Sequence, residues 1–171
     1  EKGHGEWFDI TQGVRQGSKE GPILFNLFID SILREALSRL PSNLGIQLLY
    51  RLDGQWYDYE QADQQLLVHC LLYADDLVIM ASSEADLRTI YKHIEEVLTS
   101  YQMTVSLNKT KAMVFTASPT KEQPKVRVYN RRAIAPYEQV NHFKYLGQTK
   151  QPGGKVDTEI SKRLPSANYA F

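Results

Sequence analysis

Cysteine is almost absent from this chain, which has 171 residues and contains only Cys70. A single cysteine excludes an internal disulfide framework and suits a reducing compartment, so we expect an intracellular protein, nuclear or cytoplasmic. The 4 histidines and Cys70 show none of the spacings of zinc sites. No apolar run reaches the roughly 18 residues that a membrane span needs, and no signal peptide or repeat is recognisable. We therefore expect no membrane partner.

Net charge is also absent, because 20 Lys and Arg balance 20 Asp and Glu. The two signs are nevertheless separated: residues 1–101 contain 8 basic and 16 acidic residues, whereas residues 102–171 contain 12 and 4. This polarity favours a protein that holds cations at one end and a polyanion along the other, the alternative being a solvated surface without such a role. The chain starts at Glu1 and stops within a helical pattern, so we expect a piece of a longer protein.

Two adjacent carboxylates, Asp75 and Asp76, follow Tyr73-Ala74 between the apolar runs 66–72 and 77–80. The runs are apolar on both faces, which predicts two buried central strands joined by a turn that carries both acids. Acids this close repel each other, and a bound divalent metal would relieve that repulsion, which points to phosphoryl transfer. The alternative is purely structural, because Asp is a common turn residue.

Hydrophobic periodicity predicts an α+β fold, an antiparallel sheet with helices packed on one face. Pro22 should open a buried helix over 22–40, and Ser83 with Asp86 should cap an amphipathic helix that extends to Tyr101. Asp53-Gly54 predicts a hairpin. The expected strands are 6–11, 48–52, 55–57, a hairpin over 65–81, 103–107, 111–116, 126–129 and 139–146. The remaining expectations are a loop at 118–125, a turn at 152–154 and a last helix after residue 157.

Five blocks follow one another along the chain: GVRQGSKEGPILFNLFID (13–30), LLYADDLVIMA (71–81), the helix behind it, LNKTKAMVF (107–115) and FKYLG (143–147). In this order they resemble the palm of a reverse transcriptase, in wording closest to non-LTR retrotransposon polymerases. Group II intron maturases share the YADD turn, but their loop before the helix differs. The resemblance implies template-directed, metal-dependent DNA synthesis, with an RNA template, a DNA primer and dNTP as partners. It also implies a partial palm at 1–147 and the palm exit and start of the thumb at 148–171.

The resemblance further implies roles for single residues. Asp75 matches the metal-binding aspartate and Asp76 the second acid, so both would serve a two-metal Mg²⁺ site that activates the primer 3′-hydroxyl. The expected nucleotide and template contacts are Arg15, Gln16, Gly17, Tyr73 and Lys109. The expected primer contacts are Phe143, Lys144, Tyr145, Leu146 and Gly147. Structural alternatives stand beside these roles: a strand-end aromatic for Tyr73, and solvated surface cations for Arg15 and Lys109.

Two features depart from the family pattern. Pro165 falls inside the thumb-like helix, where it should kink or break that helix. A further family aspartate lies on a palm strand well upstream, but only 12 residues precede Gly13, and neither Asp9 nor Asp30 is placed to substitute. We therefore expect an incomplete two-metal site, a palm incomplete at its N-terminus, and fingers and an upstream strand supplied by the full protein.

The isolated chain should accordingly be inactive as a polymerase and marginally stable, because a missing central strand exposes a sheet edge. The alternative function belongs to another class: a non-catalytic remnant that binds RNA or an RNA·DNA duplex through the basic back half. A decayed remnant without function is a third possibility.

Overall fold

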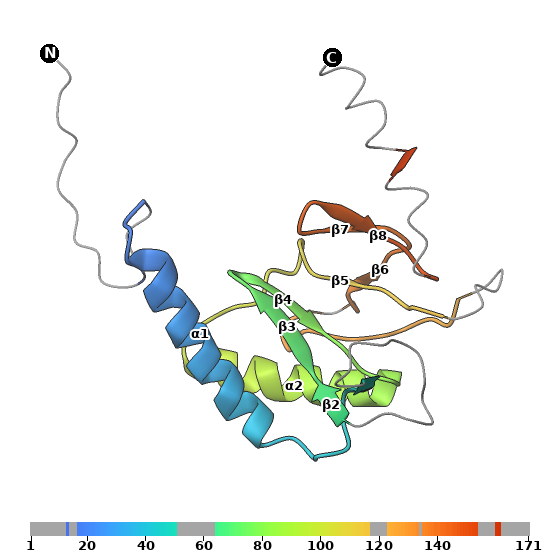
Figure 1. Ribbon diagram of the computed structural model, residues 1–171, viewed down its shortest axis with the longest axis horizontal. Coiled ribbons are helices and arrows are strands. Elements are labelled where there is room, and N and C mark those ends of the chain that lie inside the picture. The colour runs from blue at the N-terminus through green and yellow to red at the C-terminus, as the bar shows by residue number, and fades with distance from the viewer. Residues whose placement is uncertain are drawn as a thin grey trace, which may run out of the picture.

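The computed structural model describes residues 13, 17–50, 64–116, 123–133, 135–153 and 160–161, and the structural statements below concern these residues. They form two helices and eight short strands (Figure 1). The helices are α1 (Gly21–Ser38) and α2 (Glu84–Ser100). The strands are β1 (Ile46–Tyr50), β2 (Gln64–Val68), β3 (Cys70–Tyr73), β4 (Asp76–Ile79), β5 (Lys111–Ala112), β6 (Glu138–Gln139), β7 (Phe143–Tyr145) and β8 (Gln148–Lys150). The predicted α+β class is confirmed.

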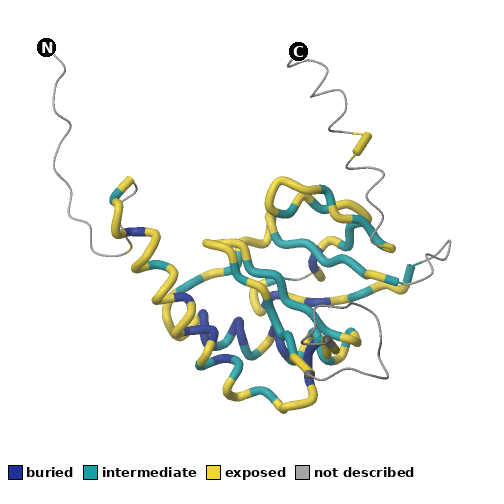
Figure 2. The backbone as a smooth tube through the Cα atoms, viewed as in Figure 1, coloured by how far each residue is buried: buried dark blue, intermediate teal, exposed yellow. Residues whose placement is uncertain are grey.

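The first helix, α1, begins where the sequence predicts. Pro22 lies in its first turn, where the missing N–H breaks no helical hydrogen bond, and the Ser18 hydroxyl accepts a hydrogen bond of 2.9 Å from the Gly21 N–H. The prediction that this helix is buried is wrong for its N-terminal half, where Ile23 is 63% and Leu27 is 65% exposed. Figures 1 and 2 show the reason: α2 crosses only the other half of α1, and the first turns extend past this contact.

The second helix, α2, has the predicted cap and stripe. The Ser83 side chain accepts a hydrogen bond of 3.1 Å from the Asp86 N–H, which satisfies an amide that no helical carbonyl can reach. The buried residues of the stripe are Ile90, Tyr91, Ile94, Val97 and Leu98. Ile90, Ile94, Val97 and Leu98 pack with the C-terminal half of α1 and with one face of β3 and β4, and together these elements form the main core, whereas Tyr91 belongs to a second core described below. Tyr101, expected on the stripe, is 44% exposed instead and its hydroxyl donates to Glu35.

The strands pair into four separate two-stranded sheets rather than one continuous sheet. β1 pairs antiparallel with β2, and the predicted hairpin at 65–81 is divided, because the chain leaves the first ladder at His69 before β3 pairs with β4. The predicted strands 103–107 and 126–129 are not regular strands, and 111–116 is reduced to β5, which pairs parallel with β6. The segment 126–129 forms no ladder: side chains, described below, bond the backbone of Val126 and Arg127, and the Tyr137 N–H donates to the Val128 carbonyl at 2.8 Å.

Several predictions from the sequence lie outside the described residues. These are the strand 6–11, the turn at Asp53-Gly54 with the strand 55–57, most of the loop 118–125, and the kink at Pro165. The last predicted helix is described only at 160–161, which is helical, and the turn at 152–154 is described at 152–153. These predictions otherwise remain predictions.

A second, smaller core joins α2 to the segment around Val128. The hydroxyls of Tyr91 and Tyr137 lie 2.6 Å apart, and the Asn130 side-chain amide donates to both, at 3.2 and 3.3 Å. All three residues are buried, and the two rings meet edge to face. This closed polar network fixes the position of the 126–130 segment on α2, because each buried polar group is satisfied only when all three are in place.

The network predicts a pH-dependent stability. Burial, followed by the hydrogen bond with Tyr137, raises the pKa of Tyr91 above its ordinary value of 10.0. The folded chain then keeps a proton that the unfolded chain releases, so this contribution is complete below about pH 10 and is lost as the pH rises above it. We expect the urea midpoint to fall more steeply between pH 9 and 11 in the native chain than in Tyr91→Phe. Tyr129→Phe, at an exposed ring, is the control and should keep the native slope; an unchanged slope in Tyr91→Phe would contradict the assignment.

Candidate active site

The two carboxylates lie on the hairpin formed by β3 and β4. Strand pairing runs from Cys70↔Ile79 through Leu72↔Leu77 to Tyr73↔Asp76, which leaves Ala74 and Asp75 as a two-residue turn. Residues directly opposite each other share a face of the ladder, so Tyr73 and Asp76 lie on the same face. That face is turned away from the helices, whereas Cys70, Leu72, Leu77 and Ile79 pack on the main core.

The prediction of strands buried on both faces is therefore wrong for the outer face, where Leu71 is 49% and Tyr73 is 63% exposed. The described residues place no further strand beside β3 or β4. The inner face of this hairpin packs on the helical core, and Ile79 also packs on the second core, which contains Val128 and Tyr137. The exposed ring of Tyr73 excludes the alternative of a core aromatic. A hairpin anchored on one face and open on the other can present its turn to a large ligand.

Asp75 occupies the tip of the turn and Asp76 is the first residue of β4, and both are exposed. Among the described residues, no hydrogen bond or ion pair engages either carboxylate, so their oxygens are available to a cation. Ala74 has a φ of 52°, in the left-handed region that favours glycine. Non-glycine residues are rarely held there, and such backbone strain is concentrated at functional sites.

Asp75 and Asp76 are two neighbouring carboxylates at one end of the β3–β4 hairpin. No group of three or more His, Cys, Asp or Glu side chains that could hold a metal ion occurs in the described part of the chain. Two oxygen-bearing side chains on one turn suit a hard divalent cation such as Mg²⁺, which prefers carboxylate and water oxygens. A third protein ligand would have to come from outside the described residues.

The predicted nucleotide contacts are only partly described. Gly17 is exposed with a φ of +85°, and a Cβ built on it would meet nothing within 4 Å. Its backbone conformation, rather than crowding, is what requires glycine there. Arg15 and Gln16 lie outside the described residues. Lys109 is exposed in a turn that the Thr110 N–H closes onto the Ser106 carbonyl at 3.0 Å, and no ion pair holds its ammonium within the described residues.

The predicted primer contacts form a separate hairpin, β7–β8. Its turn residues, Leu146 and Gly147, have φ values of 47° and 78°, which is typical of a type I′ turn. The pairs Phe143↔Lys150 and Tyr145↔Gln148 lie on one face, and Lys144 lies on the other. Lys144 therefore points to the face opposite the two aromatic side chains, whereas Lys150 shares their face. The two aromatic residues are half-buried while Lys144 is exposed.

Leu146 is a poor residue for its backbone conformation, and this predicts a stabilising substitution. Leu146→Asn should raise the free energy of unfolding by about 1 kcal/mol, because Asn tolerates positive φ better than Leu. The matched control is Leu71→Asn: both leucines are 49% exposed, but Leu71 is not among the positive-φ residues. Urea denaturation would measure both variants. An equal gain in Leu71→Asn would show that lost apolar exposure, and not backbone strain, is responsible.

Neither helix of the described residues is long and apolar enough to cross a membrane.

The hairpin with its two acids, the capped helix behind it and the second hairpin are consistent with a partial polymerase palm, and sequence comparison gives the family. The chain belongs to the reverse transcriptase (RNA-dependent DNA polymerase) family, which it matches over residues 1–150. Enzymes of this family use divalent metal ions and act on nucleic acids.

Within that family, the chain is similar to the "Retrovirus-related Pol polyprotein from type-1 retrotransposable element R2" of Nasonia vitripennis. The two are 27% identical over an alignment of 165 residues, and the alignment covers 94% of this chain. The predicted non-LTR retrotransposon type of reverse transcriptase is thereby confirmed. The chain spans 14% of the length of that polyprotein.

Proposed function

We propose that this chain forms the part of a reverse transcriptase palm that carries the metal-binding turn. The full protein would extend a DNA primer on an RNA template by Mg²⁺-dependent nucleotidyl transfer from dNTP. The observation that carries the proposal is the placement of Asp75: an exposed carboxylate without a protein partner among the described residues, at the tip of a two-residue turn whose strands pack on the helical core.

Asp75 and Asp76 would hold the metal. Asp75 would supply its oxygens from the turn, and Asp76 would add charge from the outer face of β4. Magnesium bound there would polarise the primer 3′-hydroxyl and neutralise charge on the leaving pyrophosphate. Tyr73, exposed beside Asp76, offers an apolar ring to the primer end. The anchored hairpin would keep these groups oriented during the reaction.

The remaining predicted residues would bind the substrates. Gly17, with Arg15 and Gln16, would contact the incoming nucleotide and template. Lys109 would lie near the triphosphate and could donate a proton to pyrophosphate. The β7–β8 hairpin, residues 143–147 with its return strand, would contact the primer. Under this proposal residues 1–147 belong to the palm and residues 148–171 to its exit and the start of the thumb.

We propose further that a carboxylate outside the described residues completes the metal site, because two neighbouring acids on one turn cannot surround two ions. Because the chain spans 14% of the length of the R2 polyprotein, we expect the 171 residues alone to yield no template-dependent product. The same chain, inserted into a complete polymerase in place of the matching segment, should yield template-dependent product.

In the decisive experiment, this chain replaces the matching 165 residues of the R2 polyprotein. The resulting chimera is assayed for primer extension on RNA with Mg²⁺. Template-dependent product from the chimera, absent without template, would support the proposal. The unaltered polyprotein is the positive control, and the isolated chain should be inactive. A chimera that unfolds cooperatively yet makes no product, while the polyprotein does, would contradict the proposed role.

A further inference from the structure

A basic ridge runs along the segment between the two predicted sites. Lys125, Arg127, Tyr129 and Arg131 alternate with Val126, Val128 and Asn130, and the first four are exposed while Val128 and Asn130 are buried. Alternation with a period of two belongs to extended chain, so Lys125, Arg127 and Tyr129 lie on one side of the segment. Arg131 follows them in the turn that the Ala133 N–H closes onto the Asn130 carbonyl. We call Lys125, Arg127, Tyr129 and Arg131 the basic ridge.

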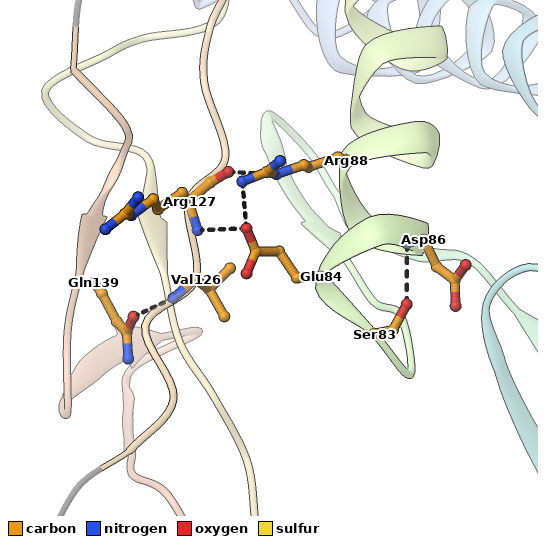
Figure 3. Close-up of polar contacts among 7 residues, drawn as sticks. All are labelled: Ser83, Glu84, Asp86, Arg88, Val126, Arg127 and Gln139. Atoms are coloured by element: carbon orange, nitrogen blue, oxygen red, sulfur yellow. Dashed lines mark hydrogen bonds and ion pairs between the residues drawn. The ribbon is translucent and has the colours of Figure 1, made fainter.

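Side chains of α2 and β6 hold this segment by its backbone. The Arg127 N–H donates to Glu84 Oε1 at 3.2 Å, and Arg88 Nε donates to the Arg127 carbonyl at 2.7 Å (Figure 3). The Gln139 amide accepts from the Val126 N–H at 2.7 Å and donates to the Pro124 carbonyl at 3.0 Å. The Tyr137 N–H also donates to the Val128 carbonyl at 2.8 Å. These bonds hold the segment by its backbone and leave the side chains of the ridge exposed.

The same bonds occupy the nearest acids and leave the cations of the ridge available. Glu84 accepts from the backbone N–H of Arg127, and Figure 3 shows the guanidinium of that residue pointing away from Glu84. The buried Glu95 accepts from the Arg131 N–H at 3.1 and 3.3 Å. Within the described residues the one ion pair of a ridge cation joins Arg131 to Glu96 at 3.7 Å, a half-exposed and therefore weak pair.

The arrangement of these side chains indicates what the ridge binds. In extended chain, successive outward residues are about 7 Å apart, so flexible Lys and Arg side chains can reach neighbouring groups of a polyanion. Tyr129 is 44% exposed between the cations and offers a ring on which a base can stack. Cations that follow a backbone, with an aromatic ring between them, are the usual elements of a single-strand nucleic-acid site. An acidic peptide would use the cations but not the ring.

We propose that the basic ridge binds single-stranded nucleic acid, with Lys125, Arg127 and Arg131 on phosphates and Tyr129 stacked on a base. The inference rests on the proposed function in that a polymerase must hold a single strand outside its catalytic turn. It adds to that function a contact that lies outside all five sequence blocks of the family resemblance.

The test measures fluorescence anisotropy of a labelled 20-nucleotide single-stranded RNA with the 171-residue chain, in EDTA and without dNTP. The variant K125A/R127A/R131A should bind at least tenfold more weakly. Its plot of log K against log salt should be shallower by about 2, since each phosphate contact of a single strand contributes about 0.7. The charge-matched control R34A/R39A/K92A, on the two helices, should keep the native slope. R127K/R131K, which retains the charges, should restore most of the affinity.

Stacking is tested separately. Tyr129→Ala should weaken binding about tenfold, while Tyr129→Phe should bind like the native chain. Tyr101→Ala is the matched control, because both tyrosines are 44% exposed. Circular dichroism would verify folding, and the ridge side chains contribute none of the backbone bonds that hold the segment. A parallel series with single-stranded DNA distinguishes a template contact from a contact with the product strand, and preference for either supports the proposal.

Three results would overturn the inference: native affinity in K125A/R127A/R131A, an equal loss in the charge-matched control, or competition by polyglutamate as strong as by unlabelled RNA. Failure of the chimera to polymerise would not overturn the inference, because the RNA-binding assay contains no metal. Asp30→Asn, at an exposed acid on α1 outside the proposed catalytic turn, should bind the RNA like the native chain. If the ridge variants lose RNA binding but the chimera has no polymerase activity, the proposed role of the ridge stands and the catalytic proposal is rejected.

Discussion

Asp75→Asn in the polymerase chimera should lower the rate of nucleotide incorporation about 10³-fold or more, a loss typical of removed transition-state charge stabilisation. The amide has the shape of the carboxylate but no charge, so it cannot hold a divalent cation against water or neutralise the pyrophosphate. Asp75 is exposed and has no protein partner among the described residues. The substitution should therefore leave the thermal midpoint and RNA binding unchanged. Single-turnover incorporation at saturating dNTP would measure the chemical step.

Two further variants serve as comparisons for Asp75→Asn in the same assay. Asp76→Asn should cost less, about 10- to 100-fold, because Asp76 lies in the ladder opposite Tyr73 and acts mainly through its charge. Asp30→Asn, which removes an exposed acid paired with Arg34 on α1, should retain full activity. Full activity of Asp75→Asn would show that the turn is not part of the catalytic site, whatever the family of the chain.

Ile94→Ala should destabilise the chain by about 2–5 kcal/mol, the usual cost of such a cavity in a well-packed core. Ile94 is 1% exposed in the main core, between the contact face of α1 and the inner face of the β3–β4 hairpin. Domains of this size are stable by only about 5–15 kcal/mol, so the variant should lose most of its folded population under mild denaturant. Urea denaturation followed by circular dichroism measures the shift.

Ile23→Ala is the matched control, because it makes the same chemical change at a residue that is 63% exposed on α1. Its cost should stay within about 0.5 kcal/mol, as for most surface substitutions. A cost similar to that of Ile94→Ala would mean that the first half of α1 is covered in solution. Such a result would refute the exposed position described above.

Local sequence signals predicted the helices well. Pro22, Ser83 and Asp86 act within one turn of a helix, so the beginnings of α1 and α2 can be predicted without knowing the rest of the fold. The apolar stripe of α2 was predicted for the same reason, since residues at helical spacing share a face wherever the helix lies. The turn carrying Asp75 and Asp76 was predicted from the two apolar runs beside it, and the family order of motifs assigned it to a polymerase.

Burial was predicted less well, because it depends on what lies beside each element. Apolar runs on both strands predicted a central hairpin, but only the inner face of β3 and β4 is covered, and Tyr73 on the outer face is exposed. The same cause explains α1, which is apolar along its length and packed along half of it. Sequence periodicity states which residues share a face and cannot state whether a neighbour covers it.

The family of this protein could be predicted from the sequence alone. An acidic turn, a glycine loop and an aromatic hairpin occur along the linear chain in the order typical of a reverse transcriptase. The segment 124–131 shows the complementary case. Its alternation of cations with apolar residues can be seen in the sequence, which predicted an ordinary strand over 126–129 and a loop before it. Glu84, Arg88 and Gln139, up to 43 residues away in the chain, bond its backbone and leave Lys125, Arg127 and Tyr129 exposed. Such contacts depend on the three-dimensional approach of α2 and β6, for which no local pattern carries a signal.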